Sequence, residues 1–307
     1  MRRIRLGSAA VAVSLALLVA ACGGGNDALQ GGNNQPSGGS KVIVGSTNFP
    51  EQLILAQMYA AVLEKAGVDV TTRLNLGNRE VVFPALVKGD IQLLPEYNGS
   101  VLSFLDPKAT ATTSQEVDTA LAPLLQAKNL VALQPSPAED KDGWAVTKET
   151  AAKYHLKTLD DLKPVAGQLV VGGPPELKTR PAGLPGLKKV YGIPDFKEFK
   201  PLDAGGPLTV SALKKGDIDI GRVFTTQGVI AAEGWVLLEE TKPLEPAQNV
   251  VPIGRTDAMT DQVKNALNTL SAKITTAELT KLNAQVDVDK KDPESVARDW
   301  LTQQGLI

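Results

Sequence analysis

From Lys41 onward, the hydrophobic and polar positions of the chain follow two alternating patterns. Apolar runs of a few residues, typical of buried strands, are followed by segments whose apolar residues recur every three or four positions, as on one face of a helix. The first run, Lys41–Gly45, precedes a helical pattern from Leu53 to Leu63, with Asn48 as its expected N-cap and Gly67 as its stop. This alternation predicts an α/β fold in which mostly parallel sheets are flanked by helices.

The same two patterns continue to the end of the chain. The further expected strands are 68–74, 91–94, 130–133, 143–146, 169–172 and 218–224, and the further expected helices are 80–88, 114–128, 260–270, 277–286 and 293–303. The segment 173–187 is rich in Gly and Pro and is expected to be a long loop. Because the last three helices bring no new sheet, we expect them to pack back on the first lobe.

One short stretch of sequence recurs 127 residues further along the chain. Ala85–Gln92 reads ALVKGDIQ, and Ala212–Asp219 reads ALKKGDID. Both copies have the pattern of a helix end, a Gly turn and the start of a strand. Such a connection is common, so coincidence remains open. The alternative is a body of two similarly built lobes with a cleft between them.

The first 21 residues have the features of an export signal. Arginines near the N-terminus precede an apolar stretch, Ala9–Ala20, that is too short to span a bilayer. Small residues lead up to Cys22, the only Cys in the chain, and resemble a bacterial lipobox. This resemblance implies a lipoprotein signal peptide over 1–21 and lipid attachment (palmitate among the acyl chains) to Cys22. An ordinary signal peptide with an incidental Cys is the alternative.

The segment that follows Cys22 is dominated by Gly, Asn, Gln, Ser and Pro. Such a composition cannot bury enough apolar surface to order itself, so we expect residues 22–40 to be a flexible linker with a reach of roughly 20–25 Å. The predicted location is therefore the extracytoplasmic face of the cell membrane, with the lipid as the anchor.

The composition excludes several classes of function. The chain has 32 Lys and Arg against 34 Asp and Glu, and this near-neutral balance gives no reason to expect nucleic acid as a partner. With one His and one Cys, a His-rich zinc site, a Cys-cluster metal site and a disulfide framework are all excluded. His155 is expected on the surface, so the usual nucleophile–base pairs cannot form, although paired carboxylates remain possible. We therefore expect a binding protein without a metal or cofactor, not an enzyme.

Several segments together resemble a known family, the osmoprotectant-binding proteins of ABC importers. These segments are Val44–Ala56, Lys88–Ser100, Pro175–Leu187, Leu202–Gly205 and Phe224–Gln227. The resemblance implies a two-lobed periplasmic-binding-protein fold, similar to type II, with lobe 1 at 41–139 plus 229–307 and lobe 2 at 140–228. It also implies a monomer that captures glycine betaine, choline or carnitine between its lobes and delivers it to an ABC permease in the membrane.

The family's chemistry suits a quaternary ammonium ion, which has no N–H to donate and is recognised by aromatic faces. The resemblance implies that Tyr97 and Phe224 are such aromatic walls, that Ser100 holds the ligand's polar end and that Arg180 grips a carboxylate. Each residue also has a purely structural interpretation: Tyr97 at a strand end, Arg180 in a solvated loop, Phe224 in the core and Ser100 as a helix cap.

The chain departs from the family at three ligand-site positions. Thr47 stands where some members have Lys, and Asp142 and Val210 stand where aromatic residues are expected. Trp144, beside Asp142, could replace one missing wall, and Asp142 could offer a charge to a cation. The alternative is a larger, less charged or aromatic ligand with the same fold and transport role. An enzymatic or structural surface lipoprotein is a second alternative.

Overall fold

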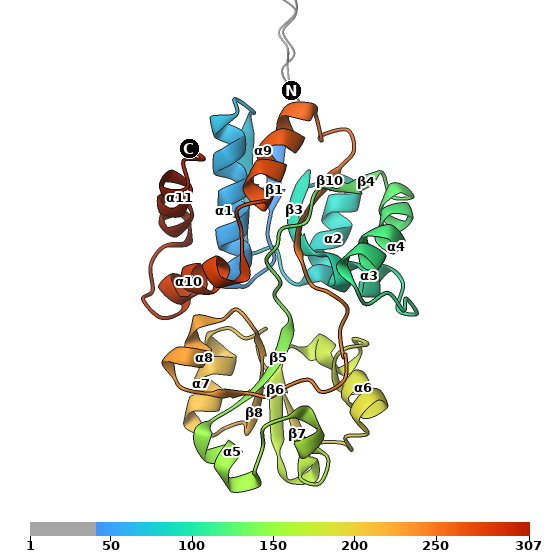
Figure 1. Cartoon of the computed structure of the whole chain (residues 1–307), viewed down its shortest axis with the longest axis vertical. Helices are drawn as coiled ribbons and strands as arrows, with labels where there is room; N and C mark the ends of the chain where they lie inside the picture. Colours follow the sequence, from blue (N-terminus) through green and yellow to red (C-terminus); the bar gives the residue numbers. More distant parts are fainter. Residues whose placement is uncertain (1–40) are drawn as a thin grey trace, which may run out of the picture. The chain divides into compact units, whose positions relative to one another are not determined.

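The computed structural model describes residues 41–307, so the expected signal peptide, Cys22 and the linker up to residue 40 lie outside the described residues. The described chain contains two five-stranded sheets, each flanked by helices (Figure 1). The expected α/β class with two lobes is confirmed. We refer to the sheet that begins the fold, with its helices, as the first lobe and to the other as the second lobe.

The first sheet has the strand order β2-β1-β3-β10-β4. Its strands are β1 (Val42–Gly45), β2 (Val70–Arg73), β3 (Leu93–Tyr97), β4 (Leu130–Ala132) and β10 (Val250–Arg255). β1 is parallel to β2 and β3, whereas β10 is antiparallel to β3 and β4. Four of its strands therefore run in one direction, as expected for a mostly parallel sheet, and only β10, an unforeseen strand from the C-terminal part of the chain, runs against them.

The second sheet repeats this arrangement with the order β7-β6-β8-β5-β9. Its strands are β5 (Asp142–Val146), β6 (Val170–Gly173), β7 (Glu198–Pro201), β8 (Ile220–Phe224) and β9 (Val236–Leu237). β6 is parallel to β7 and β8, and β5 runs antiparallel to β8 and β9. The central strands β3 and β8 thus occupy the same place in the two sheets, each flanked by one parallel and one antiparallel neighbour.

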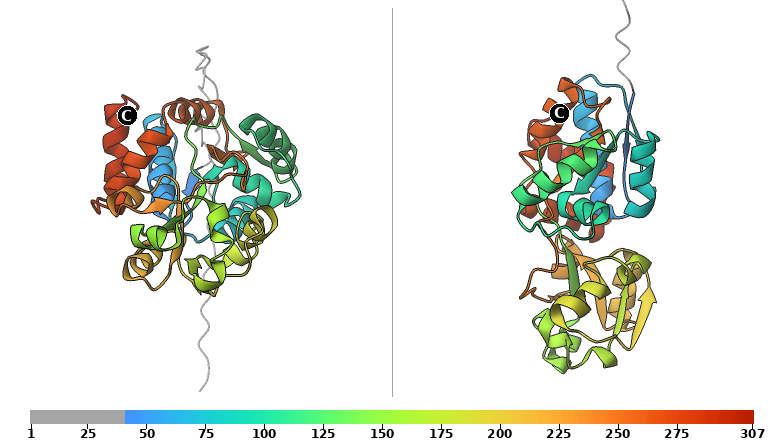
Figure 2. Two further views of the ribbon diagram at one scale, coloured as in Figure 1. Left: turned by 60° about the horizontal axis from the view of Figure 1, so that its bottom comes forward. Right: turned by 90° about the vertical axis from the view of Figure 1, so that its right-hand side faces the viewer.

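Helices cover both faces of the first sheet, as two views show (Figure 2). One apolar cluster joins the sheet to α1 (Pro50–Lys65), α9 (Asp261–Ser271), α10 (Thr276–Asp287) and α11 (Pro293–Gln303). A second cluster joins the other face to α2 (Arg79–Lys88), α3 (Asn98–Leu105) and α4 (Ser114–Gln126). The expectation that the three C-terminal helices pack on the first lobe is confirmed, since all three contact α1.

The helices of the second lobe are shorter and fall into two groups. One apolar cluster includes α5 (Lys148–Tyr154) and the turns around α6 (Leu184–Gly186). Of these two helices, α6 lies within the segment 173–187 that was expected to be a loop. The other cluster includes α7 (Pro207–Lys215) and α8 (Gly228–Ala232). Both copies of the repeated sequence are a helix end, a left-handed Gly and a strand, with Gly89 and Gly216 at positive φ as the helix C-caps.

Two chain segments, 133–141 and 238–249, connect the sheets, and they run antiparallel where Glu139 pairs with Asn249. The expected return to the first lobe at residue 229 is wrong for β9, because this strand pairs with β5 in the second sheet. Asn48 is not the N-cap of α1 either, since Phe49 holds that position in an extended conformation without a side-chain cap. No helix within residues 41–307 is long and apolar enough to cross a membrane.

Candidate functional site

Three aromatic side chains meet where the two central strands end. Tyr97 is the last residue of β3, Phe224 is the last residue of β8, and Phe49 precedes α1. The Phe49 ring stacks on Phe224 with the ring centroids 4.2 Å apart, and on Tyr97 at 6.3 Å. Because the rings come from both lobes, this stack lies at the boundary between the two sheets.

The aromatic stack forms one wall of a small cavity, which we call the inner chamber. Its volume is about 40 Å³, which is room for a group the size of a few water molecules. Its lining residues are Thr47, Asn48, Phe49, Asn78, Arg79, Tyr97, Ser100, Asp140, Asp142, Glu176, Arg180, Ala204, Arg222 and Phe224. Three of the lining residues are arginines and three are acidic, so the chamber combines aromatic faces with charged groups of both signs.

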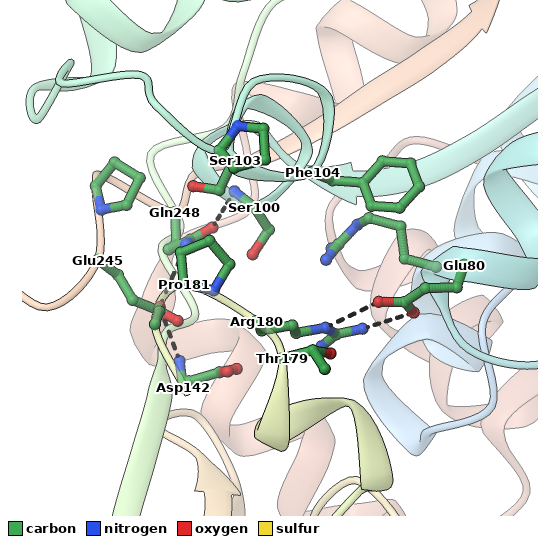
Figure 3. Close-up of a pocket in the computed structure, with 14 residues that line it drawn as sticks. Glu80, Ser100, Ser103, Phe104, Asp142, Thr179, Arg180, Pro181, Glu245 and Gln248 are labelled. Atoms are coloured by element: carbon green, nitrogen blue, oxygen red, sulfur yellow. Dashed lines mark hydrogen bonds and ion pairs between the residues drawn. The ribbon is translucent and has the colours of Figure 1, made fainter. Parts of the chain in front are cut away.

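A second cavity adjoins the inner chamber and shares Arg79, Ser100, Asp142 and Arg180 with it. This outer chamber has a volume of about 190 Å³ and is lined by residues of both lobes (Figure 3). Ser100 donates its backbone N–H to Gln248 Oε1 at 2.9 Å, and Asp142 donates its backbone N–H to Glu245 Oε2 at 3.2 Å. Burial raises the pKa of Glu245 to about 7.

The three arginines of the inner chamber have different partners. Arg79 binds Glu96 through Nε and Nη2, with its shortest contact at 2.7 Å, and this pair lies wholly within the first lobe. Arg180 binds Glu80 in the same forked way, Nε to Oε1 at 3.1 Å and Nη2 to Oε2 at 2.9 Å (Figure 3). This second pair joins the lobes, because Arg180 follows β6 in the second lobe and Glu80 lies on α2 in the first.

Arg222 is the most buried of the three arginines. Its side chain is 2% exposed, and its Nη2 is ion-paired with Asp142 Oδ1 on the neighbouring strand. The guanidinium carbon lies 3.8 Å from the centroid of the Phe224 ring, in a cation–π contact. Burial lowers the pKa of Arg222 to about 10, which still leaves the guanidinium charged at neutral pH.

A cluster of buried hydrogen bonds centred on Glu51 lies directly behind Tyr97. Glu51 Oε1 accepts the Tyr97 hydroxyl at 2.6 Å, and Oε2 accepts the Thr226 hydroxyl at 2.6 Å and an amide N–H of Asn283. Burial raises the pKa of Glu51. Since Thr226 follows β8 while the other three residues belong to the first lobe, the cluster fixes Tyr97 and also links the lobes.

Asp140 is a second buried carboxylate beside this cluster. Its Oδ1 accepts the Thr225 hydroxyl and the Thr226 backbone N–H, each at 3.1 Å. Burial, together with the nearby charge of Glu51, raises the pKa of Asp140 well above its ordinary value. Two carboxylates this close in a buried site favour retention of a proton on one of them.

Several buried polar atoms around the inner chamber have no hydrogen-bond partner within the described residues. They are Thr47 Oγ1, Asn78 Oδ1, Asp140 Oδ2, Arg222 Nε and Arg222 Nη1. Unpaired buried polar atoms are uncommon in native proteins and carry a free-energy penalty. Their concentration around one cavity is typical of a site that binds a polar ligand.

The structure brings together six of the eight residues that the sequence predicted for ligand binding. Thr47, Tyr97, Ser100, Asp142, Arg180 and Phe224 all line the inner chamber. Trp144 and Val210 do not line it. Trp144 lies two residues further along β5, opposite Arg222, and is 1% exposed in the core of the second lobe. Val210 lies on α7 and packs against the other apolar cluster of that lobe.

Sequence reasoning missed Phe49, Arg79, Asp140 and Arg222 as lining residues. Two of them could have been identified. Arg222 precedes Phe224 by two residues on one strand, so strand alternation places both side chains on one face. Phe49 lies within Val44–Ala56, one of the segments that carried the family resemblance. Within residues 41–307, no group of three or more His, Cys, Asp or Glu side chains is placed to hold a metal ion.

Comparisons with known proteins agree with this fold. Residues 40–303 match the family model described as the substrate binding domain of ABC-type glycine betaine transport systems. The chain is 28% identical over 279 residues to a glycine-betaine-binding protein of Pseudomonas aeruginosa, covering 86% of this chain and 88% of the relative. It is 27% identical over 277 residues to the carnitine transport binding protein OpuCC of Listeria monocytogenes, covering 87% of each chain.

Among solved structures, the chain resembles one described as a glycine betaine/carnitine/choline ABC transporter. The TM-score is 0.68 at 27% identity, and the match covers 86% of this chain and 99% of that chain. A glycine betaine complex of lactococcal OpuAC, at 16% identity and a TM-score of 0.60, has the same fold.

Proposed function

Because the chain belongs to the family of substrate-binding domains of ABC-type glycine betaine transport systems, we propose that it captures a quaternary-ammonium osmoprotectant of the glycine betaine, carnitine or choline type. The protein would deliver this ligand to the permease of an ABC importer. It would thus act as a binding subunit, without catalysis, metal or cofactor. The alternatives of a different ligand class and of an enzymatic or structural lipoprotein are not favoured by the family to which the chain belongs.

The observation that supports the ligand class most directly is the inner chamber. It places aromatic rings from both lobes next to arginines and to several polar atoms without partners. An aromatic face attracts a quaternary ammonium ion by about 0.5–2 kcal/mol, depending on desolvation. Arginines and hydroxyls in the same cavity suit the polar end of such a molecule.

We assign the binding role to residues that line this chamber. Tyr97, whose ring is fixed by its hydrogen bond to Glu51, provides an aromatic face, while Thr47 and Ser100 provide hydroxyls. Arg180 lies where the two chambers meet, but its forked hydrogen bonds to Glu80 and its contact with Glu176 at 3.5 Å already neutralise it. Ligand entry therefore requires the lobes to open or Arg180 to exchange partners.

We place the protein at the extracytoplasmic face of the cell membrane, as a monomer anchored by a lipid on Cys22. This part of the proposal depends on the sequence of the first 22 residues. Cys22→Ser should release the protein from isolated membranes into the soluble fraction. Intact mass measurement of the mature wild-type protein should show cleavage before Cys22 and added acyl chains. Wild-type protein that is soluble and unacylated would contradict the anchor.

Isothermal titration calorimetry with glycine betaine, carnitine and choline tests the ligand class. We expect at least one of them to bind and to raise the melting temperature, since a ligand that binds only the folded state stabilises it. Tyr97→Ala should abolish this binding, whereas Tyr154→Ala in the second lobe should leave it unchanged. If none of the three compounds binds the wild-type protein, the proposed ligand class is wrong.

A further inference from the structure

The inner chamber contains a cation of its own, the guanidinium of Arg222, at the aromatic wall. The Phe224 ring has Phe49 stacked on it at 4.2 Å and the Arg222 guanidinium carbon 3.8 Å from its centroid. Two groups this near to the centroid of one ring cannot share a face, so they cover opposite faces of Phe224. A ligand ammonium group consequently finds no free face on Phe224 in this arrangement.

Of the three arginines, Arg222 has the greatest unused capacity to donate hydrogen bonds. Arg79 and Arg180 each place Nε and Nη2 on a carboxylate of the first lobe. Arg222 has only the ion pair through Nη2, whereas its Nε and Nη1 are buried without a partner among residues 41–307. A buried donor without an acceptor carries a free-energy penalty, and the penalty is larger when the donor is charged.

The size and burial of the chamber decide which group could satisfy these donors. A volume of about 40 Å³ admits a small polar group next to Arg222. The guanidinium is 2% exposed, so its attraction for an anion is weakly screened by solvent. Arg180, by comparison, is 23% exposed and already paired with Glu80. A carboxylate meets the requirements of Arg222 best, because it is small, accepts several hydrogen bonds and is negatively charged.

We propose that Arg222 is the anion-binding residue of this site, and that the protein therefore selects ligands that carry a carboxylate over quaternary ammonium alcohols. The inference deepens the proposed function, on which it rests, by naming the ligand subclass and the residue that selects it. Within the proposed class, glycine betaine satisfies Arg222. Choline carries the same trimethylammonium group without a carboxylate, leaves the two donors unpaired and brings a second positive charge close to the guanidinium.

Calorimetric titration of the wild-type protein and of Arg222→Gln with glycine betaine and with choline tests the inference. We expect the wild-type protein to bind glycine betaine more tightly than choline. Arg222→Gln should weaken glycine betaine binding on the order of 10- to 100-fold, the effect of losing hydrogen bonds to a charged group. Choline affinity should stay the same or rise, because a competing cation is removed from Phe224. Arg298→Gln on α11, outside both chambers, is the charge-matched control and should change neither affinity.

The two proposals fail in different ways. A wild-type protein that binds neither compound overturns the proposed ligand class and this inference with it. Equal wild-type affinities for glycine betaine and choline overturn only the role of Arg222, as does an Arg222→Gln variant that keeps its affinity for glycine betaine. If Arg222→Gln does not fold, Arg222→Lys keeps the charge while losing the guanidinium donors. It should still bind glycine betaine more weakly than the wild type, and the wild-type comparison with choline needs no variant.

Discussion

The ends of the two central strands, β3 and β8, occupy equivalent positions in the two sheets and differ in what surrounds them. Tyr97 ends β3 and Phe224 ends β8, and their separation of 127 residues equals that of the repeated sequence. Two residues earlier, β3 has Pro95 where β8 has Arg222. The same backbone position thus carries an aromatic ring in both lobes, but only in the second lobe is the strand residue two positions earlier charged.

The difference shows that the same strand arrangement can have a different role in each lobe. The Tyr97 end is fixed by hydrogen bonds, since its hydroxyl donates to Glu51, which also accepts from Thr226 beyond β8. The Phe224 end is fixed by stacking between Phe49 and Arg222. We infer that the first end mainly joins the lobes and orients a ring, while the second sets the electrostatic character of the chamber.

The largest effect on stability should come from the hydrogen-bond cluster at the Tyr97 end. In Glu51→Ala, three buried donors, those of Tyr97, Thr226 and Asn283, lose their acceptor. We expect the free energy of unfolding to fall by about 4 kcal/mol in urea titrations. Glu294→Ala, which removes an exposed carboxylate on α11, should change it by less than about 0.5 kcal/mol. Equal effects of the two substitutions would contradict the assigned role of the cluster.

The stacking at the Phe224 end should contribute somewhat less. Phe224→Ala removes a buried ring together with its contacts to Phe49 and Arg222, and we expect a loss of about 3 kcal/mol in the same assay. Leu208→Ala, at an exposed position of α7, is the control for a surface truncation and should lose less than about 0.5 kcal/mol. A loss below 1 kcal/mol for Phe224→Ala would show that the stack does not stabilise this end.

The hydroxyl of Tyr97 can be tested without removing its ring. Tyr97→Phe leaves Glu51 Oε1 without its hydrogen-bond donor, and we expect a loss of about 1–2 kcal/mol by urea unfolding. Tyr59→Phe provides a matched control, because the Tyr59 hydroxyl is buried and has no partner within the described residues. That substitution should be neutral or stabilising. If both substitutions destabilise equally, the hydrogen bond to Glu51 has no special role.

The unfolding free energy should depend on pH through the buried carboxylate of Asp140. The folded-state pKa of Asp140 is raised by burial and by Glu51, so folding favours its protonated form. The resulting stabilisation is fully present below the ordinary value of 3.8 and is lost as the pH rises through the folded-state pKa. Asp140→Asn removes this titration. Its unfolding free energy should therefore fall less than that of the wild type when the pH is raised from 4. An identical pH profile would contradict the shift.

The smallest effect should come from the ion pair between the lobes at the rim of the outer chamber. The side chains of Arg180 and Glu80 are 23% and 38% exposed, so solvent screens their attraction. Glu80→Gln should lower the unfolding free energy by less than about 1 kcal/mol. The same variant frees the Arg180 fork, so we expect unchanged or tighter binding of glycine betaine by calorimetry. A stability loss above 2 kcal/mol would mean that this pair holds the lobes together.

Much of the fold could be predicted because it depends on local patterns. The helix ends at Gly89 and Gly216 follow from the need for a left-handed residue, and the three C-terminal helices follow from their apolar periodicity. Strand β10 was not predicted. Its place between β3 and β4 depends on pairing with strands far away in the sequence, which no local pattern specifies.

In the site, too, some residues could be predicted from local sequence and others depend on long-range packing. Tyr97 and Arg180 were predicted from short motifs, and both line the chamber. Asp142 and Trp144 lie on the same face of β5, yet only Asp142 reaches the chamber, because it stands at the strand end next to the lobe boundary. The burial depth of a side chain along a strand depends on the packing of the whole lobe and cannot be inferred from two adjacent motif positions.

The sequence by itself determined the alternation of strands and helices, the repeated connection into the two central strands and the aromatic residues at their ends. These features depend on backbone preferences and on which side chains avoid water, and both act over a few residues. Only the tertiary structure decided the partners. It placed Glu80 on Arg180, Glu51 on Tyr97 and both Phe49 and Arg222 on Phe224. Among residues 41–307 it also left two donors of Arg222 without a partner. Ion pairs, hydrogen bonds and ring contacts form only between groups within a few ångströms of each other. Which groups come that close depends on the packing of segments far apart in the chain.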